Sequence, residues 1–203
     1  VNKRFGGKKF NNKGANSWGG ISADIKRGIL YFTTGNPHSY FDGTQRPGDN
    51  LGSNSLIAVD LNKKKILWSF QETTHDIWNL DLPAPPILTS IKYVGKKIDV
   101  AIAITKLGNT VIFERESGNI LNDYYEMITP VSAIKGEKTS AYQKFFFKPE
   151  PFAKNIFFPS EVFSFNKNEE KKLYNFVKKN NYGFFPPFEI NKKTIIYNFH
   201  GGA

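Results

Sequence analysis

The chain has 203 residues, a length that allows one domain with a buried core, and it contains no cysteine, which excludes disulfides and thiolate metal sites. The formal net charge is +10, but only four of the 28 basic residues are arginine, the side chain best suited to bidentate contacts with bases and phosphates. The lysines form short clusters typical of a solvated surface, so we expect no nucleic-acid partner.

The first 17 residues are rich in Gly, Asn and Lys and are predicted to form a loop. After them, short β-rich runs alternate with turn signals along much of the chain. Strands of this length at roughly ten-residue spacing are typical of an all-β sandwich, barrel or propeller. The predicted strands are Ile29–Thr34, Ser55–Leu61, Ile66–Gln71, Val100–Thr105, Thr110–Glu114 and Thr194–Phe199.

Two features bear on the choice between a propeller and a sandwich. The hairpin-like pattern of residues 58–68 has a weaker echo at residues 113–121, and a repeat of about 40–50 residues is what propeller blades show. Val100–Ile104 is an unbroken apolar run, as expected for a strand covered on both faces. Periodicity alone leaves the two architectures equally open.

The region 122–193 differs from the rest in being rich in Phe, Pro and Lys. One helix is predicted from about Glu169 to Lys179, because Leu173, Phe176 and Val177 recur at helical spacing. We interpret this region as a long excursion from the β-structure and not as a separate domain.

Seven stretches of sequence follow one another in an order that is more specific than any one of them. They are Trp18–Asp24, Thr34–Pro37 with Arg46–Asn50, His75–Pro83, Thr105–Gly108 with Glu114–Gly118, Thr139–Gln143, Lys148–Phe152 and Tyr182–Pro187. The ordered set resembles the quinoprotein dehydrogenases that use pyrroloquinoline quinone (PQQ), in particular their glucose-dehydrogenase-like branch. The last three stretches are similar to the insert typical of that branch.

The resemblance implies an all-β fold, namely part of an eight-bladed β-propeller in a single domain over residues 1–203. Residues 1–121 would form cofactor-binding blades, 122–193 an insert between blades that carries one short helix, and 194–203 the start of the next blade. The chain starts at Val1 and ends within a turn signal, so we expect a fragment of a longer protein that is inactive by itself. The family's first metal-binding acid would lie before residue 1.

The resemblance also implies residue roles at a PQQ site. Trp18 would be the aromatic floor on which the flat quinone stacks. Asn36 would offer its side-chain oxygen to a hard divalent cation, Ca²⁺ or Mg²⁺, with a lanthanide as an alternative. Lys106 would place its ammonium against a quinone carbonyl oxygen and so make the adjacent carbon a better hydride acceptor. Arg46 and Asp49 would shape the loop over the site.

One position departs from the family's pattern. Where the family has an aspartate as general base, this chain has Asn79, and the change is expected to cost about 10²–10⁴-fold of general-base catalysis. Three hypotheses stay open: Asp81 is the base, because positions 79 and 81 share a face if the segment is extended; Asp81 is an additional metal ligand; or the protein binds the cofactor without turnover. Asp76 has the opposite parity, and His75 is expected to be structural.

The implied function is the PQQ-dependent oxidation of a hydroxyl group of a sugar, cyclic polyol or alcohol. Hydride would pass to PQQ and electrons to a quinone or cytochrome acceptor. The family implies a periplasmic location, with any membrane association through parts of the protein outside this chain. The rival from another class is a non-catalytic propeller scaffold, which Asn79 favours and the joint presence of Trp18, Asn36 and Lys106 opposes.

Overall fold

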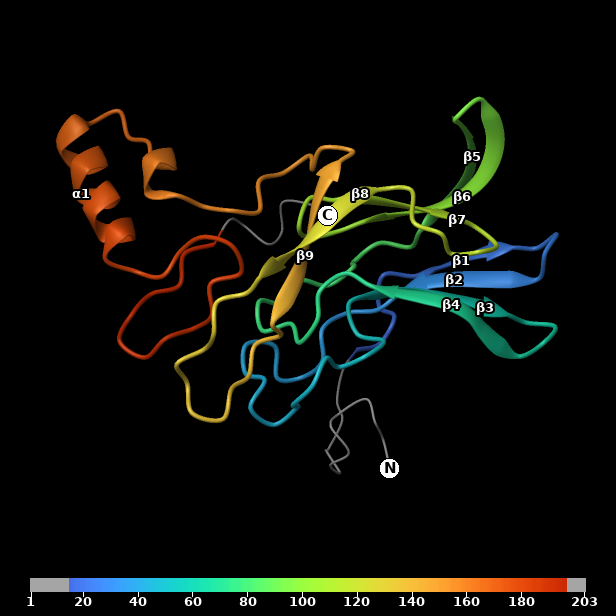
Figure 1. Ribbon diagram of the computed structural model, residues 1–203, viewed down its shortest axis with the longest axis horizontal. Helices are drawn as coiled ribbons and strands as arrows, with labels where there is room; N and C mark the ends of the chain where they lie inside the picture. Colours follow the sequence, from blue (N-terminus) through green and yellow to red (C-terminus); the bar gives the residue numbers. More distant parts are fainter. Residues whose placement is uncertain (1–14, 197–203) are drawn as a thin grey trace.

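A computed structural model describes residues 15–196, and its first sheet has four strands in sequential antiparallel order, β1-β2-β3-β4 (Figure 1). The strands are β1 (Ile21–Asp24), β2 (Ile29–Thr33), β3 (Ser55–Asp60) and β4 (Lys65–Gln71). A four-stranded antiparallel meander is the structural unit of a propeller blade. This sheet therefore has the form of one complete blade.

The second sheet has three antiparallel strands, β5 (Ile87–Tyr93), β6 (Lys96–Ile104) and β7 (Thr110–Glu114), with β6 in the middle. An isolated antiparallel bridge joins Phe113 to Ile120 at the outer edge of β7. This bridge lies within residues 113–121, where the sequence predicted a second hairpin similar to that of residues 58–68. Val100, Ala101 and Ala103 of β6 are buried, which agrees with the predicted strand covered on both faces.

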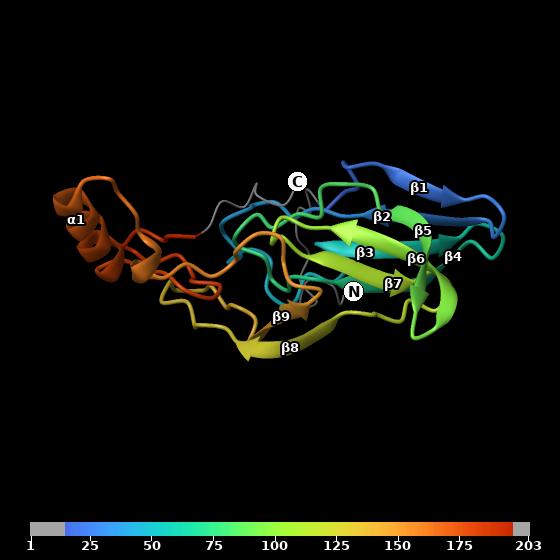
Figure 2. The same cartoon turned by 90° about the horizontal axis from the view of Figure 1, so that it is seen from above.

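The remaining strands and helices form a β-hairpin followed by a helical segment. The hairpin pairs β8 (Asp123–Ile128) with β9 (Tyr142–Lys148), and a short 3-10 helix, η2 (Pro159–Glu161), follows. Helix α1 (Lys167–Lys178) begins at Asn166, whose side chain accepts hydrogen bonds from the backbone N–H groups of residues 168 and 169. It lies at the end of the molecule farthest from the blades (Figures 1 and 2). No helix within residues 15–196 is long and apolar enough to cross a bilayer.

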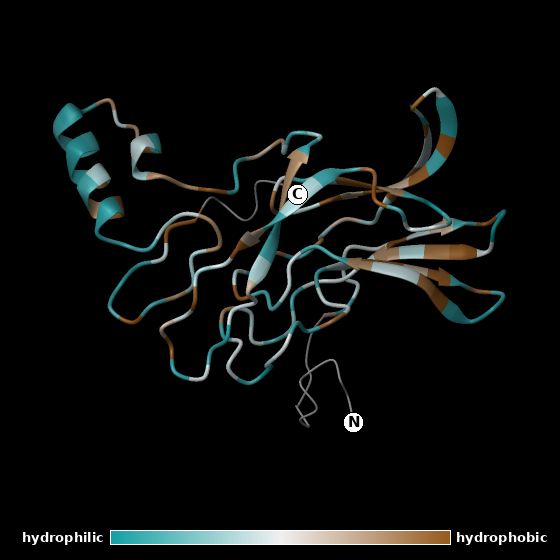
Figure 3. Cartoon of the chain, in the orientation of Figure 1, coloured by the Kyte–Doolittle hydropathy of each residue, from teal (hydrophilic) through white to brown (hydrophobic). Residues whose placement is uncertain are grey.

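The main core fills the space between the three sheets, which lie as layers in Figure 2. The apolar strands that enclose it stand out in the hydropathy colouring of Figure 3, whereas α1 is mostly hydrophilic. The Trp68 ring of β4 stacks on the Phe113 ring of β7 with a centroid distance of 5.3 Å, so the two blades share aromatic contacts. The buried members of this core are Ile29, Tyr31, Leu56, Ala58, Leu82, Ala101, Ala103, Val111, Phe113 and Phe146.

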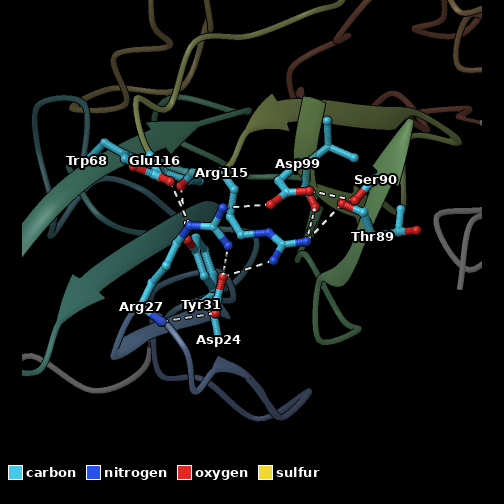
Figure 4. A network of polar contacts seen from close by, with 10 residues as sticks. Asp24, Arg27, Tyr31, Trp68, Thr89, Ser90, Asp99, Arg115 and Glu116 are labelled. Atoms are coloured by element: carbon cyan, nitrogen blue, oxygen red, sulfur yellow. Dashed lines mark hydrogen bonds and ion pairs between the residues drawn. The ribbon is translucent and has the colours of Figure 1, made fainter. Parts of the chain in front are cut away.

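A polar network also joins the two blades (Figure 4). Arg115, at the end of β7, donates to Asp24 Oδ2 of the first blade at 2.9 Å and to the carbonyl oxygen of Thr89 at 2.8 Å. Arg27 donates both to Asp24 and, at 2.6 Å, to Asp99 Oδ2 of β6. Burial acts to raise the pKa of Asp24, but the hydrogen bonds from Arg115 and Arg27 outweigh it and hold the pKa below its ordinary value.

Five of the six predicted strands and the predicted helix are present, with bounds that differ from the predicted ones by at most four residues. Sequence reading missed β1, β5, β8 and β9, although β8 and β9 lie in the region for which only a helix was predicted. Most of the predicted strand Thr194–Phe199 falls outside the described residues, and Thr194 itself forms an isolated bridge with Asn181. The division of the chain at residues 121 and 193 stays a prediction.

Candidate functional site

Three separated segments meet at one place beside the blades. They are the end of β2 with residues 34–36, the loop 72–82 that follows β4, and the turn that follows β6. The backbone N–H of Asn36 donates to Asp81 Oδ1 at 2.5 Å. Lys106 Nζ donates to Asp81 Oδ2 at 3.3 Å and to the carbonyl oxygen of Asn79 at 3.2 Å. The structure thus brings Asn36, Asn79, Asp81 and Lys106 together, although up to 70 positions separate them in the sequence.

Trp18 borders this cluster. Lys106 Nζ lies 5.9 Å from the centroid of the Trp18 ring, and Trp18 is 54% exposed. Gly35 allows this close approach: a Cβ at position 35 would stand 2.9 Å from Trp18 Nε1 and 3.2 Å from the Asp81 carboxyl carbon. A glycine at the end of β2 is therefore what lets the ring and the carboxylate occupy neighbouring positions.

Asn36 carries the clearest sign that a ligand belongs here. Its side chain is 3% exposed, and its Nδ2 donates to the carbonyl oxygen of Tyr40 at 3.0 Å. Its Oδ1 is buried and has no hydrogen-bond partner within residues 15–196. Buried amide oxygens are almost always satisfied, and an amide oxygen is a ligand that hard cations accept. The residues present therefore fit a hard cation, and Asn36 Oδ1 would contact it.

The described residues supply only part of a coordination shell. Within residues 15–196 no group of three or more His, Cys, Asp or Glu side chains is placed to hold a metal ion. Asn36 and Asp81 would contribute one amide oxygen and one carboxylate, whereas a calcium ion takes six to eight oxygen ligands. The other ligands would have to come from a bound cofactor, water or other parts of the protein.

The backbone at Asn79 is left-handed, with φ of 61°, and not extended. The premise that residues 79–82 are extended is therefore wrong at Asn79, and alternation along a strand does not explain how Asp81 reaches the site. Asn tolerates this conformation better than most residues because its short polar side chain bonds locally. Asp81 is held instead by its contacts with Asn36 and Lys106.

Asp76 shapes the loop and does not face a substrate. It is fully buried and accepts hydrogen bonds of 2.7 Å from the backbone N–H groups of Trp78 and Leu80 and from Asn54 Nδ2. Burial raises the pKa of Asp76 to about 6, although these hydrogen bonds and the charge of Arg46 act to lower it. Both carboxylate oxygens of Asp76 thus bind loop backbone or Asn54, which agrees with the prediction that Asp76 is a less suitable substitute base than Asp81.

His75 is structural, as the sequence predicted. Its Nδ1 lies 2.7 Å from the carbonyl oxygen of Gly48, and its Nε2 lies 2.7 Å from Glu137 Oε1. Glu137 Oε2 also accepts from the backbone N–H of Gly43 at 2.6 Å. Burial acts to raise the pKa of Glu137, but the hydrogen bonds from His75 and Gly43 hold it below its ordinary value.

Arg46 fixes the loop between β2 and β3. Its guanidinium donates to Asn50 Oδ1 at 2.7 Å, to the carbonyl oxygen of Ser39 at 3.1 Å and to that of Asp76 at 2.5 Å. The carbonyl oxygen of Asp49 accepts from the backbone N–H of His75 at 3.1 Å. The Arg46 side chain and the Asp49 carbonyl oxygen thus hold loop backbone, which is the role that the resemblance implied for these residues.

Sequence reading missed the residues of the region 122–193 that hold the site loop. Besides Glu137, Gln143 exchanges hydrogen bonds with Thr74, donating to its carbonyl oxygen at 2.6 Å. Trp78 Nε1 donates to the carbonyl oxygen of Pro186 at 2.8 Å, and the Phe185 ring packs edge-on against Trp78 at 4.9 Å. The only signal in the sequence was that Gln143 and Phe185 lie in stretches similar to the family's insert.

A family model described as the β-propeller domain of PQQ glucose, ethanol and alcohol dehydrogenases matches residues 2–203. The quinoprotein glucose dehydrogenase of Escherichia coli is 31% identical over 131 residues, which are 64% of this chain and 16% of that protein. The lanthanide-dependent methanol dehydrogenase of Methylorubrum extorquens is 31% identical over 142 residues, 68% of this chain and 24% of that protein.

Solved structures agree with these sequence relatives. The quinohemoprotein alcohol dehydrogenase from Comamonas testosteroni matches with a TM-score of 0.51 and 27% identity over 67% of this chain and 20% of its own. The chain thus spans between 16% and 24% of the length of these relatives. The chain belongs to the PQQ-dependent β-propeller dehydrogenase family, of which it contains part of the propeller domain.

Proposed function

We propose that the full protein oxidises a hydroxyl group of a sugar, cyclic polyol or alcohol with PQQ as its cofactor. The observation that carries this proposal is the convergence of the half-exposed Trp18 ring, the unpartnered Asn36 Oδ1 and the Lys106 ammonium at one place. A flat anionic quinone with a hard cation is the kind of ligand that an aromatic face, an amide oxygen and an ammonium suit together.

Each residue then has a defined task. Trp18 stacks on the cofactor, and Asn36 Oδ1 ligates the cation, with Ca²⁺ or Mg²⁺ as the expected ion. Lys106 presents its ammonium to a cofactor oxygen, where developing negative charge is stabilised by a fixed positive group. When bound, PQQ supplies the acceptor for the hydride that leaves the substrate carbon.

Asp81 is the carboxylate that we propose as the proton acceptor in place of the missing aspartate at position 79. Its Oδ2 lies next to Lys106 and its Oδ1 is held by Asn36, so its position is fixed before a substrate arrives. Asn79 contributes its backbone carbonyl oxygen, which accepts from Lys106, and its side chain takes no proton. A carboxylate fixed within reach of the substrate hydroxyl is what general-base catalysis requires.

A second candidate function follows from Asn79 alone. The protein would bind PQQ and the metal but turn over slowly or not at all, because the Asn79 amide is not a base and Asp81, as a metal ligand, does not replace the missing aspartate. The lanthanide-dependent methanol dehydrogenase among the relatives makes a metal with a high charge a relevant choice for this candidate. Under either candidate the electron acceptor is a quinone or a cytochrome, and the location is the periplasm.

The test is dye reduction by the full-length protein reconstituted with PQQ and Ca²⁺, Mg²⁺ or La³⁺. Glucose, other aldoses, quinate and simple alcohols are compared. The variants are Asn79→Asp, Asp81→Ala and, as a matched control, Asp123→Ala, whose carboxylate is on β8 and mostly exposed. Removing a general base is expected to lower kcat by about 10²–10⁴-fold.

Turnover that disappears in Asp81→Ala, with PQQ and metal affinity kept, supports Asp81 as the base. Loss of metal affinity in the same variant supports Asp81 as a ligand instead. A parent protein without turnover that gains it in Asn79→Asp supports the second candidate function. Failure of every variant to bind PQQ overturns both.

A further inference from the structure

Glu72 is a buried acid that the proposed chemistry does not use. It follows β4 directly, is 2% exposed, and its Oε1 accepts from Asn109 Nδ2 at 2.7 Å. Asn109 is equally buried, at 2% exposed. Two oxygens of this one pair, Glu72 Oε2 and Asn109 Oδ1, have no hydrogen-bond partner within the described part of the chain. Two unsatisfied acceptors on the two members of a single bonded pair call for a common cause.

A proton on the acid satisfies both oxygens at once. A protonated carboxyl has one O–H donor, and an amide has a free carbonyl oxygen beside its donating nitrogen. We propose that Glu72 is protonated in the folded protein and donates from Oε2 to Asn109 Oδ1, which closes a cyclic pair of two hydrogen bonds. No other reactant is needed, because the proton comes from solvent during folding.

The surroundings of Glu72 favour the neutral form. Burial raises the pKa of Glu72 to about 7, against the lowering effect of the neighbouring polar side chains of Asn109 and Thr105. The charged groups that face it are Lys144 of β9, which acts to lower its pKa, and Asp76, which acts to raise it. Burial lowers the pKa of Lys144 itself, against the attraction of Glu126, Glu72 and Asp49.

The cyclic pair braces the turn that carries Lys106. The turn closes through three hydrogen bonds: Thr105 N–H to the carbonyl oxygen of Asn109 at 3.1 Å, Gly108 N–H to that of Thr105 at 3.0 Å, and Asn109 N–H to Thr105 Oγ1 at 3.3 Å. Glu72 holds the side chain of Asn109, the last residue of this turn, against the end of β4. Glu72 is therefore a positioning residue for Lys106, and this step rests on the proposed function of Lys106.

The experiment compares the full-length wild type with Glu72→Gln in the absence of PQQ. A glutamine amide forms the same cyclic pair with Asn109 but cannot lose a proton between about pH 6 and pH 8. Amide hydrogen exchange of Thr105, Gly108 and Asn109, corrected for the intrinsic effect of pH, reports how firmly the turn is closed. Glu150→Gln, at an exposed acid, is the matched control.

We expect the protection of these three amides to fall by about tenfold from pH 6 to pH 8 in the wild type and in Glu150→Gln, and to stay constant in Glu72→Gln. In protein labelled with ¹³C at glutamate carboxyls, the signal absent from Glu72→Gln is expected to titrate well above the ordinary glutamate value of 4.5. Titration at the ordinary value, or an equal loss of protection in Glu72→Gln, overturns the proposal.

PQQ affinity is the separate readout for Lys106. The PQQ affinity of the wild type is expected to fall by about tenfold as the pH rises from 6 to 8. The affinity of Glu72→Gln is expected to stay constant over the same range. A turn that loosens while PQQ affinity does not change overturns the positioning role. Absence of PQQ binding in every protein overturns the proposed function, whereas hydrogen exchange and carboxyl titration still decide whether the Glu72–Asn109 pair exists.

Discussion

Gly35 occupies a crowded position of the candidate site. Its Cα lies where the Trp18 ring and the Asp81 carboxylate converge, and a Cβ would come within 2.9 Å of Trp18 Nε1. Real Cβ atoms rarely tolerate such a contact, so a side chain at this position has to displace the ring or the carboxylate. The absence of a side chain at position 35 is thus what allows Trp18 and Asp81 to be neighbours in the candidate site.

Gly35→Ala is expected to weaken PQQ binding by about tenfold and to lower the free energy of unfolding by about 1–2 kcal/mol, because Trp18 and Asp81 move apart. Gly95→Ala is the stability-matched control: its Cβ meets nothing within 4 Å, but its φ of +77° strains an alanine by about 1 kcal/mol. Fluorescence quenching of the tryptophans by PQQ measures the affinity. Equal affinities of the two variants would contradict this view of Gly35.

At the scale of elements, the region 122–193 holds the site loop. Its contacts with the loop are the buried His75–Glu137 pair, the Thr74–Gln143 exchange and the packing of Phe185 on Trp78. Both ring nitrogens of His75 lie 2.7 Å from an oxygen atom, one of the Gly48 carbonyl and one of the Glu137 carboxylate. A polar clamp of this kind fixes the direction in which residues 76–81 leave His75.

Glu137→Ala is expected to lower the free energy of unfolding by about 3 kcal/mol, because it leaves His75 and the Gly43 N–H buried without their partner. Residues 131–141 are also expected to become more susceptible to proteolysis, since Glu137 is the buried anchor of that loop. Glu150→Ala removes an exposed acid from the same region and should change neither quantity. Urea unfolding and limited proteolysis are the measurements, and equal behaviour of the two variants would rule out the clamp.

At the scale of the molecule, the two blades are joined by an aromatic core and by the network around Arg115 (Figure 4). Arg115 bonds Asp24 with its guanidinium, while its carbonyl oxygen accepts from Tyr31 and from Trp68 Nε1. One residue at the end of β7 therefore contacts β1, β2 and β4 of the neighbouring blade. Such contacts hold the two blades against each other, and the three site segments come from both of them.

Arg115→Ala is expected to lower the free energy of unfolding by about 3 kcal/mol near neutral pH, because Asp24 stays buried without its main partner. Since the folded pKa of Asp24 lies below its ordinary 3.8, its stabilising effect is present above that value and is lost as pH falls through the folded pKa. The difference between wild type and variant should therefore narrow below about pH 4. Urea unfolding between neutral and acid pH checks this, with Lys26→Ala as an exposed control; a difference independent of pH would contradict it.

The sequence by itself determined the strands whose pattern is local. Runs such as Thr110–Glu114 are rich in β-branched and aromatic residues and lie between turn signals, so they were predicted with correct bounds. Strands β8 and β9 mix charged and aromatic residues, so neither shows a regular alternation of apolar and polar residues. Their pairing joins residues up to 25 positions apart and cannot be inferred from either strand alone. The family could also be predicted from the sequence, because the seven stretches match the family's residue types in the same order.

Only the tertiary structure decided how those residues meet. That Asp81, and not Asp76, lies beside Lys106 follows from the left-handed turn at Asn79 and the bonds that hold Asp76 inside its loop. The roles of Glu72, Gly35 and Glu137 depend on partners 17 to 94 positions away in the sequence. A sequence pattern encodes neighbours along one element, whereas these contacts arise from how blades and the region 122–193 pack, which is a property of the whole fold.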